Sequence, residues 1–292
     1  SQCGVVGYQA PHGRIPNIGS SSFDGYSKAG PMTRTVADCA LMTNVMSGPD
    51  YRDHNSLNKM NPIILDDCDL SGIKIAFSLD LGCYEVSDDV VKETIEAIEA
   101  LRCAGALVED VPVIWAKDLI DLALGAQEVL FADYLSEVVN KHPDLVSDYV
   151  PQLLETANSY PTDTYYKSLA AAGEVWRDHI GPIFQKYDAF ITPTTTYTDI
   201  PATGWQKDTV TVNGKAFTDT ETTMAVLWNM YSRCPVMAVP SGRSTSGVPT
   251  GIQIIGRPYD DPTVFKIARA FENERPWLDC VERRPNLEIK EY

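Results

Sequence analysis

Few residues of this chain combine the types and the spacing needed to do chemistry by themselves. Gly19-Ser20-Ser21-Ser22 could present a serine nucleophile on a tight turn, but hydroxyls in such turns usually serve the turn itself. Lys117-Asp118 is more typical of a helix start than of a catalytic base, because a lysine acts as a base only when burial or a neighbouring cation lowers its pKa. A Ser-His-Asp triad stays open on composition, although no serine is favoured by its context.

Metal and cofactor sites are not favoured by the sequence. The histidines stand far apart, and none has a ligand-like neighbour at helical or strand spacing; they are His12, His54, His142 and His179. The chain contains no Gly-x-Gly-x-x-Gly or Gly-x4-Gly-Lys-Ser/Thr phosphate loop, and no Gly-x-Ser-x-Gly elbow. We therefore expect no cofactor and no metal ligand.

Composition narrows the function classes further. With 24 basic and 40 acidic side chains the net charge is −16, which disfavours binding to nucleic-acid backbones or to anionic lipid. No apolar stretch approaches the roughly 18 residues that span a bilayer. The seven cysteines have no Cys-x-x-Cys pair, so we expect reduced thiols, with Cys39 packed as a small buried hydrophobe. These features predict a cytoplasmic protein that binds neither nucleic acid nor membrane.

The elements that would position a site alternate between strand and helix. Apolar spacing predicts a helix over residues 34–47, capped by Thr35. Residues 73–77 predict a strand, residues 87–105 a helix and residues 107–111 a second strand. A strand, helix and strand of this length normally form a right-handed parallel crossover.

The second half of the chain continues this alternation. Residues 117–186 have a mostly helical pattern broken near prolines, and residues 187–193 predict a buried strand. A small hairpin is expected around Asn213-Gly214. The remaining predicted elements are a helix near 219–231, strands at 235–240 and 251–255 separated by a flexible loop at 241–249, and a final helix over 260–273.

These elements define a fold class. Strands that alternate with helices argue for an α/β fold. Because the strands are near-continuous apolar runs, we expect helices to cover both faces of the sheet. The sequence therefore predicts a mixed, mostly parallel central sheet with helices on both faces.

Five blocks of sequence, in order, resemble the amidase signature family. They are residues 3–7 (Cys-Gly-Val-Val-Gly) with Gly13-Arg14, residues 30–38, residues 187–194, residues 228–242 and residues 247–257. The resemblance covers nearly the whole chain, and it implies that residues 1–292 are the C-terminal portion of a single amidase signature domain. The sequence departs from the family pattern in three places. His12 stands where family members often have an aromatic residue, residues 24–27 replace the Ser-Leu-Asp segment that usually leads to Gly30, and residues 231–234 are bulkier than usual.

The resemblance implies an amidohydrolase that cleaves the carbon–nitrogen bond of a small carboxamide by a Ser–Ser–Lys mechanism. A neutral lysine would accept a proton through a bridging serine, the second serine would attack the carbonyl, and backbone N–H groups would stabilise the oxyanion. The family places this serine just before the Cys-Gly-Val-Val-Gly stretch, so no catalytic residue is assigned in this chain. We expect the N-terminal portion of the enzyme, as a separate chain or a preceding segment, to supply these residues, and this chain alone to be inactive.

Substrate contacts are expected on two segments. One is the loop after the strand at 187–193, and the other precedes Pro235, because α/β enzymes build sites at such positions. The candidate substrate-binding residues are Thr194, Thr195, Ile200, Trp228, Asn229 and Tyr231. Gln253 is expected to be structural, since a buried glutamine amide can bridge strands.

Other functions stay open at this point. Within the same family, the chain could be the A-type subunit of a glutamine-dependent aminoacyl-tRNA amidotransferase, which would need partner proteins. From a different class, it could be a catalytically inactive scaffold or binding module, since it holds no nucleophile motif. A homo-oligomer is a further alternative, and the sequence names neither the amide nor a stereochemical preference.

Overall fold

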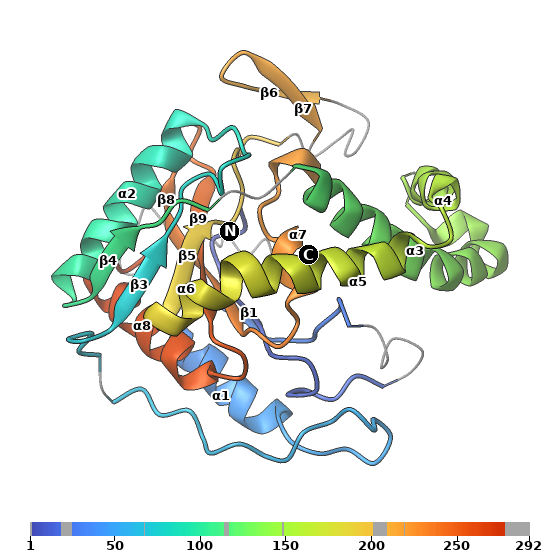
Figure 1. Cartoon of the computed structure of the whole chain (residues 1–292). Helices are drawn as coiled ribbons and strands as arrows, with labels where there is room; N and C mark the ends of the chain where they lie inside the picture. The colour runs from blue at the N-terminus through green and yellow to red at the C-terminus, as the bar shows by residue number, and fades with distance from the viewer. Residues whose placement is uncertain are drawn as a thin grey trace, which may run out of the picture.

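The computed structural model describes residues 2–18, 25–66, 68–113, 117–147, 149–200, 209–218 and 220–277. Within these residues, one seven-stranded sheet has the order β2-β1-β8-β9-β5-β3-β4 (Figure 1). Its strands are β1 (Val6–Gln9), β2 (Met32–Thr33), β3 (Lys74–Phe77), β4 (Leu107–Asp110), β5 (Ala189–Pro193), β8 (Val236–Arg243) and β9 (Pro249–Gly256).

The sheet mixes parallel and antiparallel pairs. β3 pairs in parallel with both β4 and β5, whereas the pairs β5–β9, β8–β9, β1–β8 and β1–β2 are antiparallel. The predicted crossover is confirmed, because α2 (Asp88–Cys103) connects β3 to its parallel neighbour β4. The mixed α/β class is also confirmed, but antiparallel pairs outnumber parallel ones among the described strands. One reason is that residues 244–248 between β8 and β9 are too few for a crossover and allow only a hairpin.

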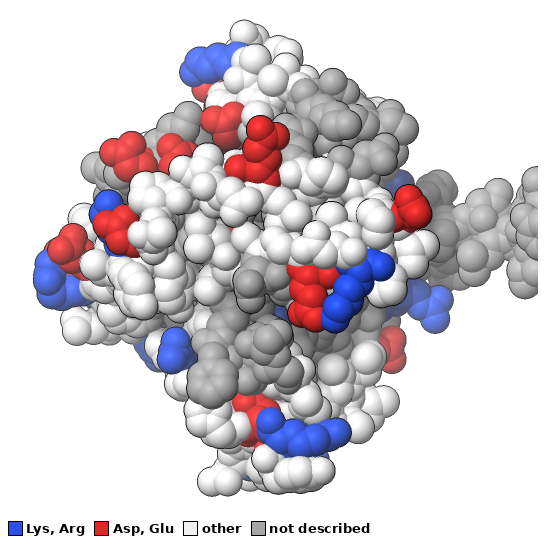
Figure 2. All heavy atoms as spheres, turned by 90° about the vertical axis from the view of Figure 1, so that its right-hand side faces the viewer, with Lys and Arg blue, Asp and Glu red and all other residues white. Residues whose placement is uncertain are grey.

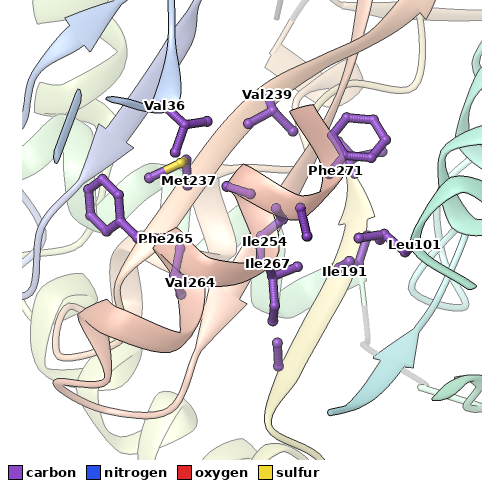
Figure 3. Packing of buried hydrophobic residues seen from close by; sticks show 14 of the residues in the cluster. Val36, Leu101, Ile191, Met237, Val239, Ile254, Val264, Phe265, Ile267 and Phe271 are labelled. Atoms are coloured by element: carbon purple, nitrogen blue, oxygen red, sulfur yellow. The ribbon is translucent and has the colours of Figure 1, made fainter. Parts of the chain in front are cut away.

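One face of the sheet is covered by α1 (Val36–Met46), α2 and α8 (Asp261–Glu274). The buried side chains of α8 recur at helical spacing and pack on the sheet. Figure 3 shows Phe265 and Phe271 of α8 on either side of Ile267, with Met237 and Val239 of β8 close by. This packing makes the larger of the hydrophobic clusters.

The opposite face is covered by helices from the middle of the chain. They are α3 (Lys117–Lys141), α5 (Thr164–Val175), α6 (Gly181–Lys186) and α7 (Val226–Met230), with α4 (Val150–Ser159) packed on α3. A second hydrophobic cluster joins Phe190 of β5, Ile255 of β9 and Trp228 of α7. Helices on both faces, and the mostly helical character of residues 117–186, are therefore confirmed.

The ends of several elements follow local signals in the sequence. The Thr35 hydroxyl accepts a hydrogen bond from the Asp38 N–H at 3.0 Å, which confirms the predicted cap of α1. The hairpin of β6 (Thr209–Val212) and β7 (Lys215–Thr218) is confirmed too. Its turn residues Asn213 and Gly214 both have positive φ, as a type I′ turn requires.

Other elements differ in length from their prediction. The helix expected near 219–231 is a short 3₁₀ turn, η4 (Thr220–Thr222), followed by α7. β8 extends to Arg243 and β9 begins at Pro249, so the ends of the loop expected to be flexible, residues 241–243 and 249, belong to the sheet. The pairing of these two strands extends their hydrogen bonding beyond their apolar runs.

A buried ion pair ties the N-terminal segment to α8. The Arg14 guanidinium donates to both carboxylate oxygens of Asp261, at 2.9 and 3.3 Å, and the Tyr8 hydroxyl donates to the same carboxylate at 2.6 Å. The Asp261 side chain is fully buried and that of Arg14 is 10% exposed. Because every charge in this group has a partner, the group can remain ionised inside the protein.

On the face nearest α4, acidic and basic side chains lie in small groups with uncharged surface between them (Figure 2).

Among the described helices, none combines the length and the apolar character needed to cross a bilayer. The described cysteines form no disulfide, and Cys39 is fully buried as expected.

Candidate functional site

A cavity of about 450 Å³ lies over β1 and β8, on the sheet face opposite α1, α2 and α8. It is lined by Gln2, Cys3, Gly7, Tyr8, Gln9, Met32, Thr194, Thr195, Thr223, Ala225, Asn229, Val236, Ala238 and Gln253. A volume of this size accommodates a small organic molecule. The lining comes from the N-terminal segment, the loop after β5, α7 and the strands of the sheet.

Strand alternation explains which side chains form the floor of the cavity. Successive side chains of a strand point to opposite faces, so Met237 packs into the larger core while Val236 and Ala238 face the cavity. Gly7 is paired with Ala238 and Gln9 with Val236, which places the four residues on one patch. A Cβ added to Gly7 would meet no atom within 4 Å, so this glycine leaves open space in the floor.

A pair of amide side chains forms a polar part of the wall. The Gln9 amide donates to the Asn229 side-chain oxygen at 2.7 Å, and this bond joins β1 to α7. Two hydrogen-bonded amides still offer one donor and one acceptor to a third group, whichever way each amide is turned. The wall can therefore pair with both the N–H and the C=O of an amide ligand.

Gln253 holds the deeper wall of the cavity in place by hydrogen bonds to backbone carbonyls. Its amide donates to the Pro193 carbonyl at 3.0 Å and to the Met224 carbonyl at 3.1 Å, and the residue is buried. The Thr194 hydroxyl donates to the Gly251 carbonyl at 3.0 Å. These bonds hold the loop after β5 against β9, in agreement with the structural role expected for Gln253.

Replacing Gln253 by leucine is expected to lower the free energy of unfolding by about 2–4 kcal/mol, because two buried carbonyls would lose their donor. Urea unfolding of the purified protein followed by fluorescence measures this loss. The control is Gln2→Leu, since Gln2 donates to the Thr198 carbonyl from a partly exposed position and its loss should cost about 1 kcal/mol or less. Equal losses for the two variants would contradict the bridging role.

Among the described residues, the cavity lining holds no group that could act as a strong base. None of the described residues that line it is a lysine, histidine, aspartate, glutamate or serine. Threonine hydroxyls and the thiol of Cys3 are present, but a hydroxyl becomes a nucleophile only next to a base. The arrangement can bind and orient an uncharged molecule, and general acid–base chemistry would have to come from groups outside this lining.

The candidate residues from the sequence lie in three places. Thr194, Thr195 and Asn229 line the cavity, whereas Ile200 is half-buried outside it. Trp228 is fully buried against Phe190 with ring centroids 5.4 Å apart. Tyr231 is buried in the same cluster and donates to the Ala172 carbonyl at 3.3 Å. The two aromatic residues thus support the cavity wall from behind, and substrate contact by all six residues stays a prediction.

Two further sequence expectations concern catalytic residues. The run of residues 19–22 lies outside the described residues. Lys117 is the first residue of α3, in agreement with its interpretation as a helix start. Among the described residues, no group of three or more His, Cys, Asp or Glu side chains could hold a metal ion.

Several lining residues were not predicted from the sequence. Two of the strands were not revealed by sequence patterns, and they contribute Gly7, Gln9 and Met32. A third strand was predicted, but the sequence did not show which of its side chains face the cavity; it contributes Val236 and Ala238. The available signal was the alternation along residues 236–239, which separates two cavity residues from two core residues. It becomes informative only when the neighbouring strand is known.

The chain is an α/β protein with a mixed sheet, helices on both of its faces and a cavity of a size that accommodates a small molecule. Comparison with known proteins assigns the family. The family described as Amidase matches residues 1–265, and the chain belongs to this family.

Individual relatives agree with this assignment. The chain is 29% identical over 288 residues to an acylamidase of Rhodococcus erythropolis, a match that covers 95% of the chain and 58% of that relative. It is 27% identical to the A-type subunit of the glutamyl-tRNA(Gln) amidotransferase of Staphylococcus saprophyticus, over 93% of the chain and 60% of that relative. The chain therefore spans about 60% of the length of these relatives.

Solved structures show the same fold. A bacterial aryl acylamidase of the amidase signature family superposes with a TM-score of 0.80 at 24% identity, over 94% of the chain and 59% of that enzyme. A 6-aminohexanoate cyclic dimer hydrolase complexed with substrate superposes with a TM-score of 0.73 at 18% identity, over 96% of the chain and 62% of that hydrolase. At these sequence identities, the structural similarity is evidence for a shared fold.

Proposed function

We propose that the protein is part of an amidohydrolase that cleaves the carbon–nitrogen bond of a small, uncharged carboxamide with an apolar acyl or aryl group. The observation that carries this proposal is the composition of the cavity. Its floor is apolar, at Met32, Ala225, Val236 and Ala238, and its polar groups are uncharged amides and hydroxyls. Such a site binds an uncharged amide without leaving a charge unpaired.

The catalytic groups of the proposal are those of the family. A serine nucleophile, a bridging serine and a lysine base would come from polypeptide preceding residue 1, either a separate chain or a further segment. Gln2 and Cys3 line the cavity, so residues that precede them in the family order would enter it directly. The described lining needs such a contribution, because it offers no base of its own.

The alternative of a glutamine-dependent amidotransferase is less well supported by the cavity. Glutamine carries an ammonium and a carboxylate, and buried charges need partners of opposite charge. None of the described lining residues is charged. An uncharged amide therefore fits the lining better, although several relatives are amidotransferase subunits.

Purification with every accompanying chain, followed by mass spectrometry and labelling with a fluorophosphonate probe, tests the proposal. We expect a labelled serine in a peptide outside residues 1–292, together with hydrolysis of acetanilide. Hydrolysis of glutamine that depends on added partner proteins would favour the amidotransferase. A preparation with neither labelling nor hydrolysis would identify the chain as a scaffold or binding module.

Filling the cavity at Gly7 is expected to lower kcat/KM for acetanilide by about tenfold or more, since one side chain in an apolar pocket alters binding by about 1–3 kcal/mol. The variant is Gly7→Leu, whose side chain would enter open space above the floor. Steady-state hydrolysis of acetanilide and of the smaller acetamide measures the change, and acetamide should be less affected. Gly173→Leu is the control, because Gly173 is exposed on α5 and also has open space around it. An unchanged ratio of the two substrates would place the substrate elsewhere.

A further inference from the structure

A second, smaller cavity lies behind the wall of the first. Its volume is about 50 Å³, and it is enclosed by the loop between β3 and α2, by α3, by the loop after β5 and by β7 and η4. The lining residues that bear on its chemistry are Tyr84, Glu85, Asp121, Thr196, Phe217 and Glu221. A cavity needs only about 10–15 Å³ to hold one water molecule, so the second cavity has room for an ion of a few heavy atoms.

A single pair of extended segments separates the two cavities. Residues 194–196 pair with residues 222–224 through a bridge and two backbone hydrogen bonds of 2.8 and 3.1 Å. Thr195 and Thr223 line the first cavity, whereas Thr196 lines the second. The second cavity is therefore distinct from the first, and the wall between them is held by backbone hydrogen bonds.

The lining of the second cavity is negatively charged. Glu85, Asp121 and Glu221 all line it, and none of the described lining residues is a lysine or an arginine. Glu85 has its counter-ion outside the lining, in Lys215 at 2.5 Å. Asp121 forms no hydrogen bond or ion pair within the described part of the chain. At least this carboxylate thus faces the cavity without an opposite charge from the described residues.

Two hydroxyl groups add acceptors to this lining. Thr196 is only 2% exposed, yet its hydroxyl has no hydrogen-bond partner among the described residues, whereas buried hydroxyls are normally paired. The Tyr84 hydroxyl donates to the Thr223 carbonyl at 3.2 Å and can still accept a bond. Burial, and then the charges of Cys83 and Asp121, raise the pKa of Tyr84, so this hydroxyl lies within the field of the Asp121 carboxylate.

We propose that the second cavity binds a small ammonium ion, either ammonium itself or a short primary alkylammonium. An –NH₃⁺ group donates three hydrogen bonds, so it would pair with the Thr196 hydroxyl and with a carboxylate and would supply the missing counter-charge. The rings of Tyr84 and Phe217 also favour a cation. A metal ion suits the lining less well, because no three described His, Cys, Asp or Glu side chains lie close enough together to hold one.

This proposal does not rest on the proposed amidase function, although an amine released from an amide is one source of such an ion. Saturation-transfer-difference NMR with methylammonium, on the protein purified with every accompanying chain, tests the site. At constant ionic strength, we expect the methyl signal to rise to a plateau with concentration, and sodium should not displace it. Tetramethylammonium has the same charge but is larger and has no N–H group, so it should give no saturable signal.

Competition with ammonium separates the two sources of the ligand. Half-displacement of methylammonium at an ammonium concentration below the Kd of methylammonium would identify ammonium as the preferred ion, and a higher concentration a short alkylammonium. The absence of a saturable methyl signal, equal displacement by sodium, or equal binding of tetramethylammonium would overturn the proposal.

Three variants decide whether the ion lies in the second cavity. Asp121→Asn should raise the Kd for methylammonium by about tenfold or more, because it removes a charged acceptor. Asp118→Asn is the matched control, since Asp118 lies one turn earlier on α3, is exposed and does not line the cavity, and its Kd should not change. Thr196→Val keeps the shape of the side chain without the hydroxyl and should raise the Kd by about fivefold.

The variants are expected to fold, because neither the Asp121 nor the Thr196 side chain holds a hydrogen bond within the described part of the chain, and circular dichroism checks this. An unchanged Kd in Asp121→Asn, or the same rise in Asp118→Asn, would overturn the proposal. Amide hydrolysis plays no part in the readout, so a failure here is distinct from a failure of the proposed amidase function.

Discussion

Replacing Asp261 by alanine is expected to lower the free energy of unfolding by about 3–5 kcal/mol, because removal of one partner leaves a buried charge uncompensated. Asp261 is fully buried and accepts hydrogen bonds from the guanidinium of Arg14 and from the hydroxyl of Tyr8. Without the carboxylate, the guanidinium stays inside the protein with no counter-ion among these groups. Urea unfolding of the purified protein, monitored by fluorescence and circular dichroism, measures the loss.

The adjacent residue offers a matched control for this variant. Asp260 has the same charge, and its side chain accepts from the Thr263 N–H at 3.3 Å as the cap of α8. Asp260→Ala should therefore cost about 1 kcal/mol, the usual value of a helix cap. Tyr8→Phe removes one hydrogen bond to a charged group and should cost about 1.5–3 kcal/mol. If Asp261→Ala were no worse than Asp260→Ala, the ion pair would not be what joins the N-terminal segment to α8.

The ion pair also helps to position residues of the cavity. Tyr8 and Arg14 belong to the N-terminal segment whose residues Gly7 and Gln9 form part of the cavity floor and wall. α8 lies on the other face of the sheet, so the pair fixes β1 from behind. Loss of Asp261 should therefore disturb the Gln9–Asn229 contact although neither residue touches the carboxylate.

Most elements of the fold could be predicted because their signals are local. The cap at Thr35, the apolar spacing of α2 and α8, and the Asn213-Gly214 turn each depend on a few neighbouring residues. β1 and β2 were not predicted, since each is short and one holds a glycine. Their strand conformation comes from pairing with distant residues, which a local pattern does not contain.

The cavity was only partly predictable for the same reason, because its lining depends on contacts between residues that are far apart in the sequence. Asn229, Thr194 and Thr195 could be proposed because they lie beside the strands that a family resemblance marks. Trp228 was proposed on the same ground, but a large aromatic side chain is more often buried than exposed to a ligand, and here it fills the core. Gln9 reaches Asn229 only because β1 lies beside β8, and this pairing joins residues more than 220 positions apart.

Replacing Gly30 by alanine is expected to lower the free energy of unfolding by about 3 kcal/mol or more, because the new methyl group would collide with backbone. Its Cβ would lie 1.6 Å from the Tyr8 carbonyl oxygen, and overpacking typically costs about 1–3 kcal/mol even where side chains can move. Gly30 and β1 would have to separate, which strains the bond from the Tyr8 N–H to the Pro31 carbonyl. Urea unfolding measures the loss.

Gly7→Ala is the control for this effect of close approach. Gly7 lies on β1 beside Tyr8, but a Cβ there would meet nothing within 4 Å. Alanine also restricts the unfolded chain more than glycine does, so this variant should be neutral or more stable by about 0.5–1 kcal/mol. The difference between the two alanine variants thus isolates the contact of Gly30 with β1. Equal stabilities would mean that the segment before β2 can move away from β1 freely, and the cavity wall at Met32 would then not be fixed.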